Sequence, residues 1–137
     1  MTHFKVKSYW VYLCVIIDVY SRKIVGWRVS KNASTHLVTK TFRTADQERG
    51  RPGNLTFHSD RGSQYISKAL TALFQKYAVK QFFSATARPL DNAVAESFFS
   101  TFIVKKHIAG SILPSNTSKR ALKSIFGFTM KSYRIKR

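Results

Sequence analysis

Acidic residues are scarce in this sequence. Six Asp and Glu residues stand against 24 Lys and Arg residues, so the formal net charge is +18. This imbalance favours attraction to a polyanion, with nucleic acid as the first candidate and an anionic membrane surface as the second. Residues 97–137 contain nine basic residues and no acidic residue at all. The chain therefore divides into a body of mixed charge and an acid-free tail, and each carboxylate of the body needs an explanation.

Cysteines and long apolar runs are also nearly absent. Cys14 is the only cysteine, which excludes a disulfide within the chain, and its place in "VYLCVII" predicts a buried, inert thiol in a reducing cytoplasm. No apolar run reaches the roughly 18 residues of a membrane-spanning helix, so we expect no membrane partner. The 44% hydrophobic and 14% aromatic residues instead predict one packed globular domain.

The hydrophobic pattern predicts strands followed by alternating helices and strands. The expected strands lie in 4–20 (an edge leading into a buried central strand), 21–30, 51–60 and 79–86, and the expected helices in 32–50, 67–78 and 92–106. A turn at Tyr20 to Lys23 would join the second and third strands into a hairpin. The expected helix caps are Asn32 or Ser34, then Ser67, then Asp91 or Asn92. This order predicts an α/β fold with a mixed central sheet and helices packed on it.

Asp60 and Glu96 are the candidate metal ligands. Asp60 ends a predicted strand, and ligands on such sheets gather at the carboxyl ends of central strands. The helix, strand and loop between the two residues can return Glu96 to that end, where two carboxylates would bind Mg2+ or Mn2+ through oxygen. Asn92 lies four residues before Glu96 and would position it or contact a phosphate. Spacing alone favours a blander interpretation, in which Asp60 caps a turn and Glu96 is a solvated helix residue.

Three strings change that balance: "YLCVIIDVYSRKIVGWRVS", "HSDRGSQY" and "DNAVAESFFSTF". In order and spacing they closely resemble the integrase-core transposases of bacterial insertion sequences, which are relatives of retroviral integrases with a ribonuclease H-like fold. The resemblance extends over residues 2 to about 101. It implies a Mg2+-dependent (or Mn2+-dependent) polynucleotidyl transferase of the bacterial cytoplasm that cuts and joins DNA, both insertion-sequence ends and target, as a multimer. It also implies that Asp60 and Glu96 are the second and third members of an Asp-Asp-Glu metal triad.

The sequence departs from the family pattern in two places. The family's first catalytic Asp stands just before the segment that matches "MTHF", so the first strand is truncated at Met1. Asp18 is a possible substitute, but a role in anchoring the hairpin near Ser21 and Arg22 is favoured. Residues 102–137 form a basic tail that is atypical for the family, which suggests a frameshifted or disordered end. We therefore expect an integrase core at 1–101 with little or no strand transfer, and the alternative is a non-catalytic, basic nucleic-acid-binding remnant.

Several other side chains are candidates for contact with DNA. The residues expected to contact the DNA are Arg61, Arg88, Asn92, Lys105 and Lys106. Gly62 either lets a phosphate approach the backbone or simply forms the turn after Asp60. His58 lies on the same side of its strand as Asp60, and a packed or half-exposed role is favoured over contact with metal or DNA. The aromatic residues expected in the core rather than in base stacking are Trp10, Trp27, Phe82, Phe83, Phe98 and Phe99.

Overall fold

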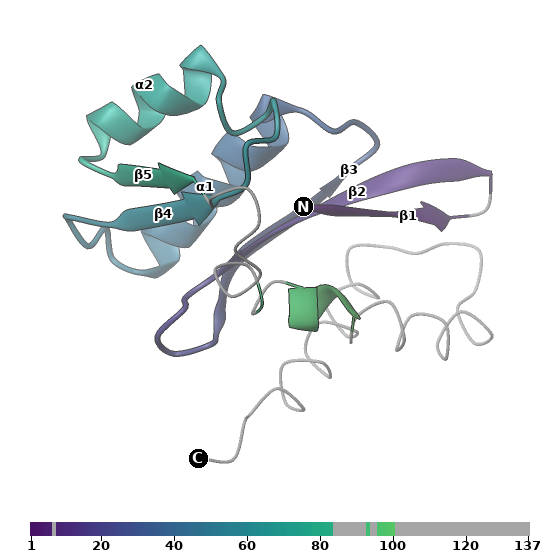
Figure 1. Cartoon of the computed structure of the whole chain (residues 1–137), viewed down its shortest axis with the longest axis horizontal. Helices are drawn as coiled ribbons and strands as arrows, with labels where there is room; N and C mark the ends of the chain where they lie inside the picture. The colour runs from purple at the N-terminus through teal and green to yellow at the C-terminus, as the bar shows by residue number, and fades with distance from the viewer. Residues whose placement is uncertain (7, 84–92, 94–95, 101–137) are drawn as a thin grey trace.

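The computed structural model describes residues 1–6, 8–83, 93 and 96–100 (Figure 1). The strands are β1 (Thr2–Val6), β2 (Tyr9–Ile17), β3 (Ile24–Ser30), β4 (Thr56–Ser59) and β5 (Lys80–Phe83), and the helices are α1 (Thr35–Glu48) and α2 (Lys68–Lys76). Helical backbone also occurs at Ala93 and at residues 96–100. The order of elements agrees with the predicted order. The start of the third predicted helix and the tail at 102–137 lie outside the described residues.

Among the ranges just named, no helix combines the length and the apolar character that crossing a membrane requires.

The strands form two sheets (Figure 1). β1, β2 and β3 are antiparallel with β2 in the centre, and β4 and β5 form a parallel pair. The predicted α/β class is confirmed, and both kinds of strand pairing are present. Over the described residues they belong to separate sheets, because β1 forms its ladder with β2 and β4 forms its ladder with β5.

The central strand β2 contributes to two hydrophobic clusters. Cys14 belongs to the cluster that α1 and α2 complete, whereas Leu13 packs with Phe98 in a second cluster. Successive side chains of a strand point to opposite faces, which explains why the apolar run is continuous. Burial raises the pKa of the Cys14 thiol, outweighing the hydrogen bond with Thr41 and the positive charge at Met1. The predicted core position of this cysteine is therefore confirmed.

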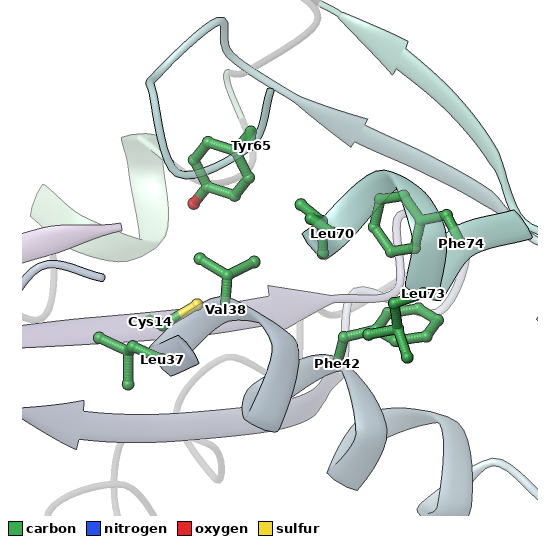
Figure 2. Packing of buried hydrophobic residues seen from close by; sticks show 8 residues of the cluster. All are labelled: Cys14, Leu37, Val38, Phe42, Tyr65, Leu70, Leu73 and Phe74. Atoms are coloured by element: carbon green, nitrogen blue, oxygen red, sulfur yellow. The ribbon is translucent and has the colours of Figure 1, made fainter. Parts of the chain in front are cut away.

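The two helices begin at predicted caps. The Ser34 hydroxyl accepts a hydrogen bond from the Leu37 N–H at 3.2 Å, and Ser67 caps α2 in the same way. In α1 the apolar residues Leu37, Val38, Phe42 and Ala45 recur at helical spacing and are buried, as is the polar Thr41. Figure 2 shows how α1 and α2 contribute to one core with β2 and the loop after β4, through Leu37, Val38, Phe42, Leu70, Leu73, Phe74, Cys14 and Tyr65.

The prediction for the aromatic residues was correct for three of them and wrong for three. Phe98 is buried, and Trp27 and Phe99 pack against it and Leu13. The residues that are instead exposed are Trp10 (52%), Phe82 (53%) and Phe83 (38%). Alternation along a strand says which side chains share a face, but it does not say whether a helix covers that face.

Candidate metal and nucleic-acid site

Asp60 follows the last residue of β4, at the carboxyl end of the parallel pair, and its side chain is exposed. Its Oδ1 accepts a hydrogen bond from the Gly62 N–H at 2.8 Å, and the Gly62 carbonyl accepts one from the Tyr65 N–H at 2.9 Å. Gly62 therefore forms the turn, which is one of its two predicted roles. Over the described residues the second oxygen, Oδ2, makes no hydrogen bond within the chain.

A pocket of about 210 Å³ opens beside Asp60. We call it the Asp60 pocket, and its lining includes Thr2, His3, Tyr12, Asp60, Gln64 and Tyr65. One wall comes from the loop after β4, and the other comes from β1 and β2. The residues of this second wall lie about 50 or more positions away in the sequence, so sequence reasoning missed them. Gln64 and Tyr65 were also missed, although the string "HSDRGSQY" contains both.

Tyr65 connects the Asp60 turn to the rest of the fold. Its carbonyl accepts a hydrogen bond from Gln81 Nε2 at 2.7 Å, and its hydroxyl accepts one from the Met1 nitrogen at 3.4 Å. Burial raises the pKa of the Tyr65 phenol, and the neighbouring Cys14 and Asp60 groups raise it further. The phenol therefore stays protonated, and a protonated hydroxyl in the pocket lining can donate a hydrogen bond to an anionic ligand.

Glu96 is exposed on a helical segment, and it is not among the residues that line the Asp60 pocket. Phe98, two residues further on, is 1% exposed and packs against Leu13, which attaches this segment to the antiparallel sheet. In the part of the chain that the structure describes, no three His, Cys, Asp or Glu side chains gather closely enough to hold a metal ion. Asp60 thus lies in the lining of the pocket, and Glu96 does not.

Asp18 has the structural role that the sequence favoured. Its carboxylate accepts hydrogen bonds from the backbone N–H groups of Tyr20 and Ser21 and from the Ser21 hydroxyl. It also pairs at 2.6 Å with Arg49, which lies at the end of α1 and which the sequence did not indicate as a partner. Burial alone would raise the pKa of Asp18, but these hydrogen bonds and the Arg49 charge outweigh burial and lower it.

The structure describes some of the remaining candidate residues for DNA contact but not others. Arg61 is exposed beside Asp60, whereas Arg88, Asn92, Lys105 and Lys106 lie outside the described residues. The His58 ring is exposed and stacks on the Phe82 ring with 5.7 Å between centroids. His58 is not among the residues of the Asp60 pocket.

The donor chemistry of the pocket fits a hard divalent cation. The Asp60 carboxylate and the Gln64 amide oxygen are oxygen ligands of the kind that Mg2+ prefers. Among the described residues Asp60 supplies the only negative side chain of this lining, and more carboxylates are usual where two divalent ions bind. The pocket therefore suits Mg2+ in the kind of donor atoms it offers, with one carboxylate in place.

Comparison with known proteins gives consistent results. The family model described as integrase core domain matches residues 1–89. The transposase InsF for insertion sequence IS3A of Escherichia coli (strain K12) is 34% identical over 105 residues, which are 77% of this chain and 36% of that protein. The transposase for insertion sequence element IS904 of Lactococcus lactis is 36% identical over 138 residues, which are 100% of this chain and 53% of that protein. The chain spans about a third to a half of the length of these relatives.

Solved structures show the same fold. The integrase catalytic core domain of HTLV-2 in complex with magnesium, in its dimeric form, matches 99% of this chain and 83% of its own with a TM-score of 0.68. A simian T-cell lymphotropic virus intasome in complex with a PP2A regulatory subunit matches 99% of this chain and 46% of its own with a TM-score of 0.74. Both are 18% identical in sequence. The likeness shows that the predicted ribonuclease H-like architecture is correct.

Proposed function

This chain belongs to the integrase core domain family, and from that premise we propose that it forms the catalytic core of a transposase, which cuts and joins the DNA ends of an insertion sequence. The observation that carries the proposal is the position of Asp60, at the carboxyl end of a parallel strand pair and in the lining of an oxygen-rich pocket. The net charge of +18 supports DNA as the substrate.

Asp60 and Glu96 are the proposed ligands of Mg2+ or Mn2+. When bound, such an ion supplies Lewis acidity at phosphorus and makes an attacking hydroxyl more acidic. The Gly62 N–H holds Oδ1 of Asp60, which leaves Oδ2 for the ion. The nucleophile is water for cleavage and a 3'-hydroxyl for joining.

Other side chains would hold the DNA. The protonated Tyr65 hydroxyl can donate a hydrogen bond to a phosphate in the pocket, and exposed Arg61 offers a positive charge beside Asp60. The further proposed DNA contacts are Arg88, Asn92, Lys105 and Lys106. We also propose that the protein acts as a homo-oligomer on paired DNA ends, in line with the dimeric form of the HTLV-2 core.

The 137-residue polypeptide is proposed to be weak or inactive in strand transfer by itself. The family pattern has three carboxylates, and the resemblance assigns two of them in this sequence, Asp60 and Glu96. Fewer carboxylates hold divalent ions less well against their hydration. The alternative function is a non-catalytic nucleic-acid-binding remnant in which residues 102–137 act as a basic tail.

A nicking and strand-transfer assay with Mg2+ or Mn2+ tests both functions. We would compare the 137-residue chain with the same chain extended before Met1 by an Asp and a completed first strand, each with and without Asp60→Asn. Asp18→Asn is the matched control, because Asp18 is a carboxylate outside the pocket lining. The transposase proposal expects activity in the extended chain that Asp60→Asn abolishes and Asp18→Asn preserves.

The other outcomes discriminate between the alternatives. Activity that survives Asp60→Asn would remove Asp60 from the catalytic set. Activity in the unextended chain that Asp18→Asn abolishes would make Asp18 a metal ligand. The binding remnant would be favoured if no chain showed nicking or strand transfer and if Asp60→Asn left the DNA affinity unchanged or raised it. Such a rise is expected because losing a negative charge near a phosphate strengthens the attraction.

A further inference from the structure

Four side chains share one face of the β1–β2 hairpin: His3, Lys5, Trp10 and Tyr12. The strand register pairs His3 with Tyr12 and Lys5 with Trp10, and directly opposed residues of an antiparallel pair point to the same face. We call this set the aromatic platform. Its three rings make two contacts, because the His3 ring centroid lies 5.1 Å from that of Trp10 and 5.9 Å from that of Tyr12.

The platform is open at its outer end. Trp10 is 52% exposed, and the side chains of His3 and Lys5 are exposed as well. α1 packs on β3 and β2, and Figure 1 shows the β1–β2 hairpin extending away from it. The contact with His3 fixes the indole from one side, so a large, rigid aromatic surface remains accessible to a ligand.

The platform is continuous with the Asp60 pocket. His3 and Tyr12 belong both to the platform and to the pocket lining, whereas Trp10 lies one step further out along the hairpin. If one phosphate of a phosphate-containing polymer lay in the pocket, the neighbouring units of that polymer would therefore lie on the platform. Lys5, directly opposite Trp10, supplies a positive charge beside that path.

We propose that the aromatic platform binds unpaired nucleotides of a DNA end, with one base stacked on the Trp10 indole. Every base has a flat π-face that an aromatic side chain can stack on, but in a duplex this face is already covered by neighbouring base pairs. A single-stranded segment, which exposes the faces of several bases, therefore fits the platform better than a duplex does. The inference rests on the proposed function in one respect, which is that the substrate is DNA.

Charge favours DNA over a second copy of the chain as the occupant. Each copy has a formal net charge of +18, so a DNA strand is complementary to Lys5 and to the chain as a whole, whereas a second copy at this face would need DNA to offset its like charge. Among the described residues that line the pocket, Asp60 carries the only carboxylate, so a phosphate there meets a single negative charge within a chain whose net charge is +18.

The first experiment measures the affinity of the whole chain for two DNA probes. One is a blunt duplex, and the other is the same duplex with a short single-stranded 3' extension; both are titrated in EDTA. We expect Trp10→Leu to weaken binding of the extended probe by about ten-fold and to leave the blunt probe within a factor of about two. Trp10→Phe, which keeps a smaller ring, should lie between Trp10→Leu and the unsubstituted chain.

Tyr20→Leu is the matched control. Tyr20 is 98% exposed and follows the opposite end of β2. The substitution Tyr20→Leu therefore removes an exposed ring without changing the platform. It should leave both affinities unchanged. A second readout is the fluorescence of Trp10, which a stacked base should quench; in Trp10→Phe, where Trp27 alone reports, the quenching by the extended probe should disappear.

Three results would overturn the proposal. Equal losses for both probes would mean that Trp10 acts through folding or general affinity, and no loss for either would mean that it does not contact DNA. An oligomer that Trp10→Leu dissociates, with the preference for the extended probe intact, would make this face a protein interface. If the probe whose extension is made of RNA bound more tightly than the DNA probe, and if this binding depended on Trp10, the ligand would be RNA rather than DNA.

The test separates this inference from the proposed function. No divalent ion is present, so the Trp10 effect does not depend on cleavage. A Trp10-dependent preference, together with no DNA cleavage by the chain extended before Met1, would support the platform and contradict the transposase assignment. DNA cleavage by the chain extended before Met1, without a Trp10-dependent preference for the extended probe, would support the transposase assignment and contradict the platform.

Discussion

The Asp60 carboxylate and Gly62 are in contact through a single hydrogen bond of 2.8 Å, from the Gly62 N–H to Oδ1. A Cβ atom at position 62 would lie 2.9 Å from the same oxygen and 3.1 Å from Oε1 of Gln64. The turn therefore both holds the carboxylate and leaves no space for a larger residue beside it. The orientation of the proposed metal ligand depends on the absence of one methyl group.

Gly62→Ala should disturb this carboxylate with little effect on the fold. The added methyl would push Oδ1 away from the Gly62 N–H, so we expect Mn2+ affinity to fall by about ten-fold, as when a supporting partner of a metal ligand is lost. Calorimetric titration measures the affinity, and thermal unfolding checks stability. Gly53→Ala is the control, because a Cβ there meets nothing within 4 Å. Equal Mn2+ affinity in both variants would contradict the prediction.

Gly26→Ala should destabilise the contact between β3 and α1. A Cβ at position 26 would lie 2.8 Å from the Ala45 Cβ and 2.9 Å from the Thr41 carbonyl oxygen. We expect a loss of about 2 kcal/mol in the free energy of unfolding, measured with urea. Adding Ala45→Gly, which costs about 1 kcal/mol alone, should give a total loss smaller than the sum, because it removes part of the clash. Additive losses would show that the helix moves away instead.

Ala78→Gly should stabilise the protein. Ala78 follows α2 with φ +53°, its N–H donates to the Gln75 carbonyl, and the Val79 N–H donates to the Phe74 carbonyl. This Schellman motif normally has glycine at the left-handed position, and an L-residue there costs about 1 kcal/mol. The expected gain in the free energy of unfolding is about 1 kcal/mol.

The matched control for Ala78→Gly is the end of α1. There the equivalent residue is Gly50, with φ +69° and nothing near its Cβ position, so Gly50→Ala should lose about as much as Ala78→Gly gains. A change of the same sign in both variants would be inconsistent with a backbone origin.

Asp18→Asn should change how stability depends on pH. The folded-state pKa of Asp18 is lowered, so its contribution to stability is present above the unfolded pKa of about 3.9 and is lost as pH falls through the folded value. We expect the variant to be less stable by about 1 kcal/mol at neutral pH, with the difference shrinking below about pH 4. Urea unfolding across pH measures it, and Arg49→Met should show part of the same loss. A difference independent of pH would contradict the role of the charge.

Local sequence signals were sufficient to predict most elements of the fold. Ser34 and Ser67 have the hydroxyl that a helix cap requires, and the apolar positions from Leu37 to Ala45 recur with the helical period, so each helix could be located from its neighbours alone. Asp60 was likewise placed by the turn residues after a short strand. These signals act over a few residues, which is why they can be interpreted without knowledge of the tertiary structure.

Contacts between distant segments could not be predicted in this way. Trp10 has the apolar character of a core residue, but it is exposed because α1 lies over β3 and the far part of β2. Asp18 was correctly placed in the hairpin, yet its partner Arg49 comes from the end of a helix 31 positions away. In both cases the outcome depends on how two elements pack, and the sequence pattern of either element is compatible with more than one arrangement.

The sequence by itself determined the fold class, the helix starts, the core position of Cys14 and the position of Asp60 at the end of its strand. Only the tertiary structure decided which side chains share the Asp60 pocket, because His3 and Tyr12 reach it through the pairing of β1 with β2 and the packing of that hairpin beside the loop after β4. Caps, turns and periodicity are local properties of a chain. A pocket is a property of surfaces that meet, and those surfaces are fixed by side-chain packing over the whole domain.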